Sequence, residues 1–161
     1  MSRFIGIDPG KGGAIAILDG YGEIVTVEDM PVAARTVVGS VLTDIIDDAL
    51  MVSGDVLNDA VDITAIVEQV HSMPKQGVAS SFDFGKSYGI VLGVLAGARV
   101  HVEHVSPQRW KRAMRLPADK EACRLRAIDR WPGQSHLFKL KKHADRAEAA
   151  LIALWWIESR S

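Results

Sequence analysis

Two short apolar segments, each ending in a carboxylate, place the strongest constraint on how this chain folds. Residues 4–7 run directly into Asp8, and residues 63–67 run directly into Glu68. Both runs have the length and β-branched content of buried strands. Between them, residues 34–51 repeat their apolar positions at three- and four-residue spacing, which predicts an amphipathic helix. Strands joined by a helical crossover are parallel neighbours. Asp8 and Glu68 are therefore expected near the same edge of a sheet, where α/β proteins bind ligands.

The other segments alternate between strand and helix patterns. Apolar runs at 14–18 and 23–27 flank the turn signal Asp19-Gly20, so the first three strands are expected to form an antiparallel meander. Ser106 and Asp119 have the composition of helix caps, the first followed by Pro107. Further elements are expected at 79–97 (helix), 100–105 (strand), 108–114, 120–131 and 144–157 (helices). The predicted fold class is α/β, a mixed five-stranded sheet with helices on both faces.

Two more carboxylates, Asp145 and Glu148, lie three residues apart in the last predicted helix and so share one of its faces. Carboxylate oxygens are hard ligands that suit Mg²⁺ or Mn²⁺, and two such ions form the usual site for in-line attack of water on a phosphodiester. With Asp8 and Glu68 these residues predict a nuclease centre. The structural alternatives are a turn aspartate before Pro9 and a solvated helix face. A carboxylate that ends a buried strand needs an ion partner or a metal.

The net charge of −1 conceals a strong division along the chain. Residues 1–98 carry 5 basic and 13 acidic side chains, whereas residues 99–146 carry 13 basic and 5 acidic ones. A basic half on an otherwise acidic protein favours a polyanionic partner such as nucleic acid, although solvated helix faces would produce the same composition.

The stretch Ile5-Gly6-Ile7-Asp8-Pro9-Gly10 resembles the opening of the RuvC-type Holliday junction resolvases of the ribonuclease H superfamily. That family continues with a glutamate ending its fourth strand and closes with an acidic pair on its last helix, the places held here by Glu68 and by Asp145-Arg146-Ala147-Glu148. Segments 12–16, 81–89 and 105–111 are similar to its short phage-borne branch. The resemblance covers almost the whole chain. It implies a ribonuclease H-like fold and a homodimer that cuts four-way junctions and other branched DNA, leaving 5′-phosphates. Two Mg²⁺ ions per site, replaceable by Mn²⁺, would be held by Asp8, Glu68, Asp145 and Glu148.

Several residues outside the acidic set are expected to contact DNA. Lys11 follows the first turn and either touches a phosphate or is a surface lysine. Phe82 and Phe84 either stack on unpaired bases at a junction centre or are buried in the core or a dimer interface. Phosphate contacts are expected from the basic half, at Arg109, Lys111, Arg112, Arg115, Lys120, Arg124, Lys139, Lys141 and Lys142.

Three further features leave more than one interpretation. His143 either supports the metal site, for example as a general base, or contacts a DNA phosphate. Glu148 stands where bacterial relatives have the shorter aspartate, which is expected to change the metal spacing. The 79–97 helix has a ridge of glycines at every fourth position, Gly85, Gly89, Gly93 and Gly97. This ridge is expected either to contact a second copy of the chain or to pack within the subunit. Trp110, Trp131 and Cys123 are expected to pack in the core.

A length of 161 residues suits one nuclease domain, residues 1–161. One cysteine excludes a disulfide framework within the chain and fits a reducing compartment. No signal peptide or membrane span is predicted, so the expected location is the cytoplasm, with a phage-encoded protein acting in its host.

An actin-like ATPase is disfavoured because a second phosphate loop is missing. A junction-binding structural DNA protein with a lapsed site remains as the alternative, and the complete acidic set argues against it.

Overall fold

The computed structural model describes residues 2–10, 12–51, 62–69 and 77–160. A five-stranded sheet has the order β3-β2-β1-β6-β7. Its strands are β1 (Ser2–Asp8), β2 (Ala14–Asp19), β3 (Ile24–Asp29), β6 (Asp62–Glu68) and β7 (His101–Val105). The β1–β2 and β2–β3 pairs are antiparallel, whereas β1–β6 and β6–β7 are parallel. The predicted mixed sheet is confirmed.

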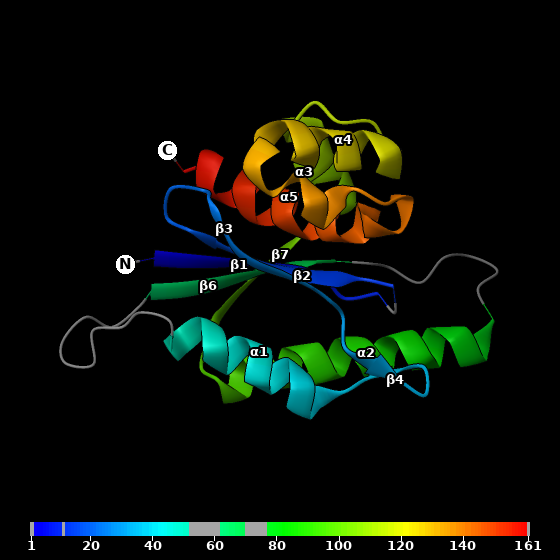
Figure 1. The fold of residues 1–161 in the computed structure, drawn as a ribbon. Coiled ribbons are helices and arrows are strands. Elements are labelled where there is room, and N and C mark those ends of the chain that lie inside the picture. The colour runs from blue at the N-terminus through cyan, green and yellow to red at the C-terminus, as the bar shows by residue number, and fades with distance from the viewer. Residues whose placement is uncertain (1, 11, 52–61, 70–76, 161) are drawn as a thin grey trace.

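Helices cover both faces of this sheet, as predicted (Figure 1). One layer contains α1 (Gly39–Met51) and α2 (Val78–Gly97), and the other contains α3 (Pro107–Ala113), α4 (Lys120–Arg130) and α5 (Ala144–Glu158). Alternation along β1 sends Ile5 and Ile7 into the core beneath α1 and α2. Phe4 packs against the opposite core, which contains α5. The central strands are therefore buried on both faces, which explains their continuous apolar runs.

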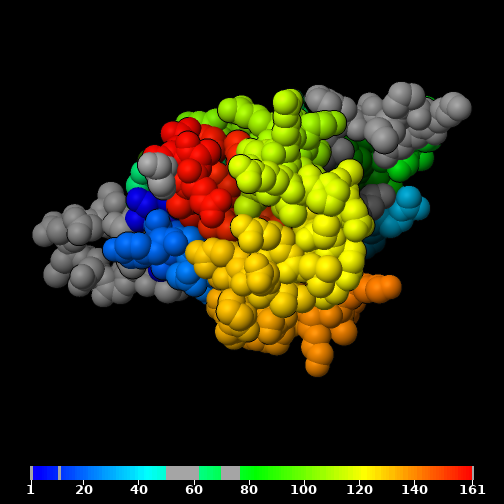
Figure 2. All heavy atoms as spheres, turned by 90° about the horizontal axis from the view of Figure 1, so that it is seen from above, coloured from blue at the N-terminus to red at the C-terminus, as the bar shows by residue number. Residues whose placement is uncertain are grey.

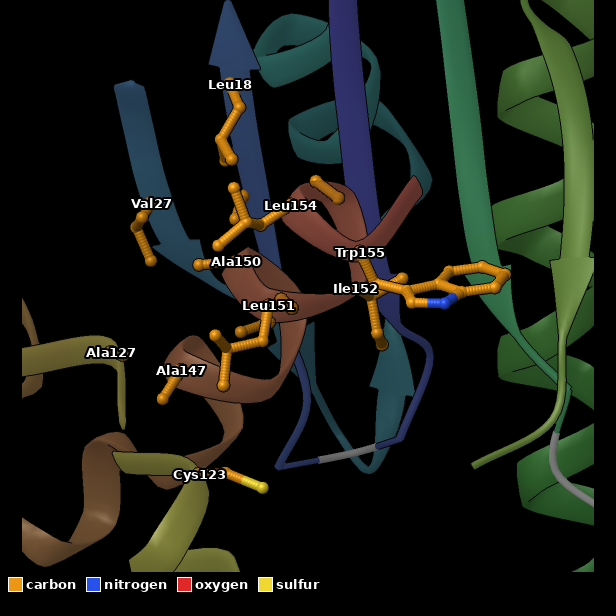
Figure 3. Packing of buried hydrophobic residues seen from close by; sticks show 14 of the residues in the cluster. Leu18, Val27, Cys123, Ala127, Ala147, Ala150, Leu151, Ile152, Leu154 and Trp155 are labelled. Carbon is orange, nitrogen blue, oxygen red and sulfur yellow. The ribbon is translucent and has the colours of Figure 1, made fainter. Parts of the chain in front are cut away.

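The helix α5 lies directly on β1 because Gly6 has no side chain. A Cβ at Gly6 would overlap the backbone carbonyl oxygen of Ala149. Leu151 and Leu154 lie in the same core cluster as Ala127 of α4, so side chains from α5, α4 and the sheet fill this layer together (Figure 3). The close approach fixes where the first turn of α5 stands relative to the strand ends.

One predicted boundary was wrong. The helix expected over residues 34–51 begins at Gly39, and the preceding residues form a small hairpin of β4 (Val32–Ala33) and β5 (Thr36–Val37). Its turn holds Ala34 and Arg35 at φ of 48° and 66°, a left-handed conformation that no helix pattern contains. Val37 is buried in the core that also receives Leu42. Because Val37 is buried two residues before the helix begins, it continued the apolar spacing of the helix and made the predicted helix too long.

The C-terminal elements follow their predicted caps. The Ser106 hydroxyl accepts from the Arg109 N–H at the start of α3, and the Asp119 carboxylate accepts from the Glu121 N–H at the start of α4. The connector before α5 forms two short 3-10 helices, η1 (Pro132–Phe138) and η2 (Lys141–His143). Among the described helices, none combines the length and the apolar character that crossing a membrane requires.

Candidate metal centre

Asp8 and Glu68 end the two central parallel strands. The register of β1 and β6 sets Ile7 opposite Val67, so the two carboxylates that follow lie at the same edge of the sheet. Their side chains are nearly buried, with 8% and 7% of each residue exposed. The Gly10 N–H donates to Asp8 Oδ1 at 3.0 Å, which orients this carboxylate within its turn. The predicted placement at one sheet edge is confirmed.

Asp145 and Glu148 reach the same place from α5. Asp145 lies in the first turn of the helix, and Glu148 is buried one turn later. One carboxylate oxygen each from Asp8, Asp145 and Glu148 lie within 4.8 Å of one another. Carboxylates this close repel unless a proton or a cation lies between them. The structure therefore brings together three of the four predicted ligands.

Electrostatics within this cluster favour a cation. Burial raises the pKa of Asp8 to about 7, with further increases from the charges of Glu68, Asp145 and Glu148, although the Gly10 N–H acts in the opposite direction. Burial also raises the pKa of Glu68, as does the Glu148 charge. The donor set offers carboxylate oxygens, and burial raises the pKa of Asp8 and Glu68, so these two resist ionisation in the absence of a positive partner. It fits a hard divalent cation.

Two lysines lie within the acidic cluster. The Lys111 ammonium is 2.5 Å from Glu148 Oε1, and Lys120 pairs with Asp145 and lies 3.7 Å from Glu148 Oε2. Burial alone would lower the pKa of both lysines, but their bonds to Glu148 and Asp145 raise it above the ordinary value. Both ammonium groups therefore stay charged. They offset part of the acidic charge of the cluster.

Glu68 is not part of the three-carboxylate group. Its Oε1 accepts a hydrogen bond of 2.8 Å from the indole N–H of Trp110, which is fully buried. From the sequence, Trp110 was expected only to pack in the core. A contact between residues 42 positions apart has no local sequence signal, so this bond became visible only in the folded chain.

Metal-free protein is expected to lose stability as pH rises from about 4 to above 7. Over this range the folded Asp8 keeps a proton that the unfolded chain has released, so folding is favoured at the lower pH. Asp8→Asn should consequently be more stable than the wild type at pH 8, by at most roughly 4 kcal/mol. Thermal melting at pH 5 and pH 8 measures the difference.

The control for this prediction is Asp44→Asn on α1, which changes an exposed carboxylate far along the chain from the cluster. Added Mn²⁺ should raise the melting temperature of the wild type more than that of Asp8→Asn, because a cation bound only by the folded state stabilises it. The prediction is contradicted if the stability gap between Asp8→Asn and the wild type is the same at both pH values.

Comparisons with known proteins show where this fold has been seen before. A scan against protein-family models found no match, and neither did a search of curated proteins. Solved structures do match: T. thermophilus RuvC in complex with a Holliday junction substrate aligns with a TM-score of 0.61 and 18% identity, over 99% of this chain and 96% of that chain. A second Thermus thermophilus RuvC structure gives 0.58 and 19% identity over 98% and 96%. This chain has the RuvC fold. The resemblance inferred from its motifs is confirmed at the level of fold.

Within this RuvC fold the predicted DNA-binding basic residues fall into three groups. Lys111 and Lys120 contact the acidic cluster. Arg124 is engaged inside the protein, where its guanidinium bonds Glu121 and the carbonyl oxygens of Phe138 and Lys139 and so fixes η1 against α4. Six others are exposed: Arg109, Arg112, Arg115, Lys139, Lys141 and Lys142. Phosphate contact stays a prediction for these six, while Arg124 has a structural role.

Phe82 and Phe84 differ in how far their side chains are exposed. Phe82, near the start of α2, is 70% exposed, so burial in the core of this subunit does not account for it. Phe84 is partly buried and stacks on Tyr88 with ring centroids 6.0 Å apart. Base stacking stays a prediction for both. Lys11 lies outside the described residues.

His143 is buried next to the N-terminus of α5 and is not in the three-carboxylate group. Its Nδ1 accepts from the Leu140 N–H at 3.3 Å, so this ring anchors the connector. Burial lowers the pKa of His143, and the charges of Arg146 and Lys142 lower it further, which favours the neutral ring. A buried, neutral imidazole is poorly suited to an exposed phosphate contact.

Proposed function

We propose that this protein is a structure-selective endonuclease that cleaves four-way (Holliday) junctions and other branched DNA with the help of two divalent cations. The observation that carries the proposal is the convergence of Asp8, Asp145 and Glu148 oxygens within 4.8 Å of one another, at the sheet edge where Glu68 also ends its strand. One RuvC structure with the same fold was solved with a Holliday junction substrate.

In this proposal Asp8, Glu68, Asp145 and Glu148 would hold two Mg²⁺ ions, for which Mn²⁺ would substitute. When bound, such a pair supplies an activated water and stabilises the leaving 3′ oxygen, giving 5′-phosphate products. The protein contributes four carboxylates, of which Asp8, Glu68 and Glu148 are buried. Lys120 pairs with Asp145 and has a side chain that is 58% exposed, so its ammonium would be open to a DNA phosphate beside the carboxylates.

The proposed DNA surface adjoins this centre. Residues 99–146, which carry the basic excess, form much of the face seen in Figure 2, next to α5. A hollow on α3 is lined by Pro107, Gln108, Lys111, Arg112 and Leu116, and the ammonium of the same Lys111 pairs with Glu148 of the acidic cluster. The exposed lysines around η2 precede α5 directly and would hold the flanking phosphates.

A homodimer is proposed because a two-fold junction needs paired cuts. The glycine ridge of α2 supports it. A Cβ added at Gly85, Gly89, Gly93 or Gly97 would meet no atom of the described residues within 4 Å. Among the described residues, nothing packs against this ridge, which argues against packing within the subunit. An open glycine stripe allows a second helix to approach closely, and we propose that α2 of another copy lies there.

Gly89→Leu is expected to give a folded monomer that binds junctions weakly and cannot make paired cuts. The new side chain blocks close helix contact but enters open space in the subunit, and leucine favours the helix over glycine by roughly 1 kcal/mol. Light scattering reports the mass, against 17.5 kDa for one chain, and thermal melting reports the fold. Gly133→Leu is the matched control, since a Cβ there also meets nothing within 4 Å. A Gly89→Leu protein that remains dimeric would move the dimer interface elsewhere.

A cleavage assay on a synthetic four-way junction, titrated with Mg²⁺ and Mn²⁺, tests the proposed function. The same arms joined as linear duplex provide the control. Metal-dependent, paired incision of the junction with little cutting of the duplex is expected. Junction binding without cleavage at any metal concentration would instead support the structural DNA protein with a lapsed site.

The proposal also covers the setting in which the enzyme works. Residues 1–161 are taken as one nuclease domain that acts in DNA recombination and repair. A cytoplasmic site of action is consistent with Cys123, a free and buried thiol. The resemblance to the short phage-borne branch favours a phage gene whose product acts in the host.

A further inference from the structure

The Glu68 side chain lies on the face of the sheet that α5 covers, as Ile66 two residues earlier does, and one hydrogen bond to a neighbouring helix orients it. Its backbone ends β6, and 7% of the residue is exposed. A buried carboxylate on a flexible three-bond side chain needs fixed partners to hold one rotamer. The indole N–H of Trp110 supplies such a partner, at 2.8 Å from Oε1.

Trp110 is itself rigidly held. It lies in α3, which begins at a proline behind the Ser106 cap, and none of its surface is exposed. It belongs to the core cluster that includes Leu151 and Trp155 of α5. An indole packed in this way cannot follow a moving carboxylate, so the hydrogen bond fixes Glu68 and not the reverse.

The neighbouring residue makes α3 a link between two ligands. Trp110 bonds Glu68 of β6, while Lys111 bonds Glu148 of α5 at 2.5 Å. The Lys111 ammonium also lies 5.2 Å from the centroid of the Trp110 ring, so the two side chains support each other. Consecutive residues of one short helix thus hold carboxylates from two separate elements at a set spacing.

We propose that Trp110 is a positioning residue for the metal centre, which orients the Glu68 carboxylate so that Oε2 is presented to a divalent cation. This inference rests on the proposed metal-dependent function. Groups that hold a metal ligand in place typically change metal affinity by about 10- to 100-fold when removed. Trp110 has no expected contact with DNA, so its effect should appear in metal binding and not in junction affinity.

Trp110→Phe tests the proposal, because it removes the N–H donor and keeps an aromatic side chain in the core. The matched control is Trp131→Phe. Trp131 is 2% exposed, lies in the same core cluster and donates its indole N–H at 3.0 Å, but to the carbonyl oxygen of Gly22. The two substitutions therefore delete equivalent buried hydrogen bonds, only one of which ends on a metal ligand.

In Trp110→Phe, the affinity for Mn²⁺ should weaken about 10- to 100-fold. Calorimetry measures this affinity directly, and the Mn²⁺ concentration for half-maximal junction cleavage measures it through activity. Trp131→Phe should stay near the wild type. Saturating Mn²⁺ should restore most of the cleavage rate in Trp110→Phe, which a damaged core would not allow. In a Glu68→Gln background, Trp110→Phe should cause little additional loss of Mn²⁺ affinity.

The wild-type protein provides a second measurement that needs no stable variant. Its four tryptophans give four indole N–H signals in a nitrogen–proton correlation spectrum, and Mg²⁺ should shift the Trp110 signal well beyond that of Trp131. Equal metal affinity in both tryptophan variants, or an unmoved Trp110 signal when Mg²⁺ binds, would overturn the inference alone. A wild-type protein that neither binds Mn²⁺ nor cleaves junctions would overturn the proposed function and this inference with it.

Discussion

Asp8→Asn, Glu68→Gln and Asp145→Asn are each expected to abolish cleavage of a four-way junction while leaving junction binding near the wild-type level. Each change removes the negative charge of one proposed ligand and keeps its shape. Loss of a metal ligand costs several kcal/mol of transition-state stabilisation, which corresponds to a decrease in rate of roughly 10³-fold or more. Affinity for the junction should persist because phosphate contacts dominate it.

Single-turnover cleavage at saturating Mg²⁺ measures the rate, and a parallel binding titration without divalent cations measures the affinity. Asp44→Asn on the exposed face of α1 controls for loss of an acidic charge elsewhere. Cleavage by Glu68→Gln at the wild-type rate would remove Glu68 from the site. Full activity in all three variants would show that the acidic cluster is not the catalytic centre.

The strand-end carboxylates could be predicted because their position depends on short stretches of sequence. An apolar run of strand length fixes where a strand ends, and a helical crossover fixes that two such strands are parallel. Asp8 and Glu68 therefore had to lie at one edge once β1 and β6 were recognised. Asp145 and Glu148 were predictable for a similar reason, since three residues on a helix share a face.

Contacts between distant elements could not be predicted in this way. The bonds of Trp110 to Glu68, Lys111 to Glu148 and Lys120 to Asp145 join residues 42, 37 and 25 positions apart. No periodicity connects such pairs, because their meeting depends on how α3 and α4 pack around α5. The two lysines were consequently assigned to phosphates, as their charge alone suggests, although their nearest partners are carboxylates of the cluster.

The role of the glycine ridge on α2 could not be predicted from the sequence either. A stripe of four glycines suits a helix that another part of the same subunit approaches closely, and it suits equally a helix face that is open. The sequence does not distinguish these two cases. The inward side of this helix is filled by Val91 and Leu95, which are completely buried. Only the folded arrangement shows that the glycines occupy the other side and face outward.

Junction affinity is expected to fall by two or more orders of magnitude between about 50 and 200 mM salt, because several phosphates are neutralised at once. Replacing Lys139, Lys141 and Lys142 together with alanine should flatten this dependence. All three are exposed and lie in the connector that leads into α5, within a few residues of Asp145. Each lost phosphate contact should reduce the slope of log affinity against log salt by about 0.9.

Arg126→Ala combined with Arg160→Ala is the control for this experiment. Both arginines are exposed, but Arg160 follows the far end of α5, about 22 Å along the helix from Asp145 at 1.5 Å per residue. Their loss should leave the slope close to the wild-type value. Counterion release depends on which charges touch phosphate and not on the net charge. If both variants flatten the slope in proportion to the charges removed, DNA is held by the general electrostatic field of the basic half. An unchanged slope in the lysine variant would place the DNA surface elsewhere.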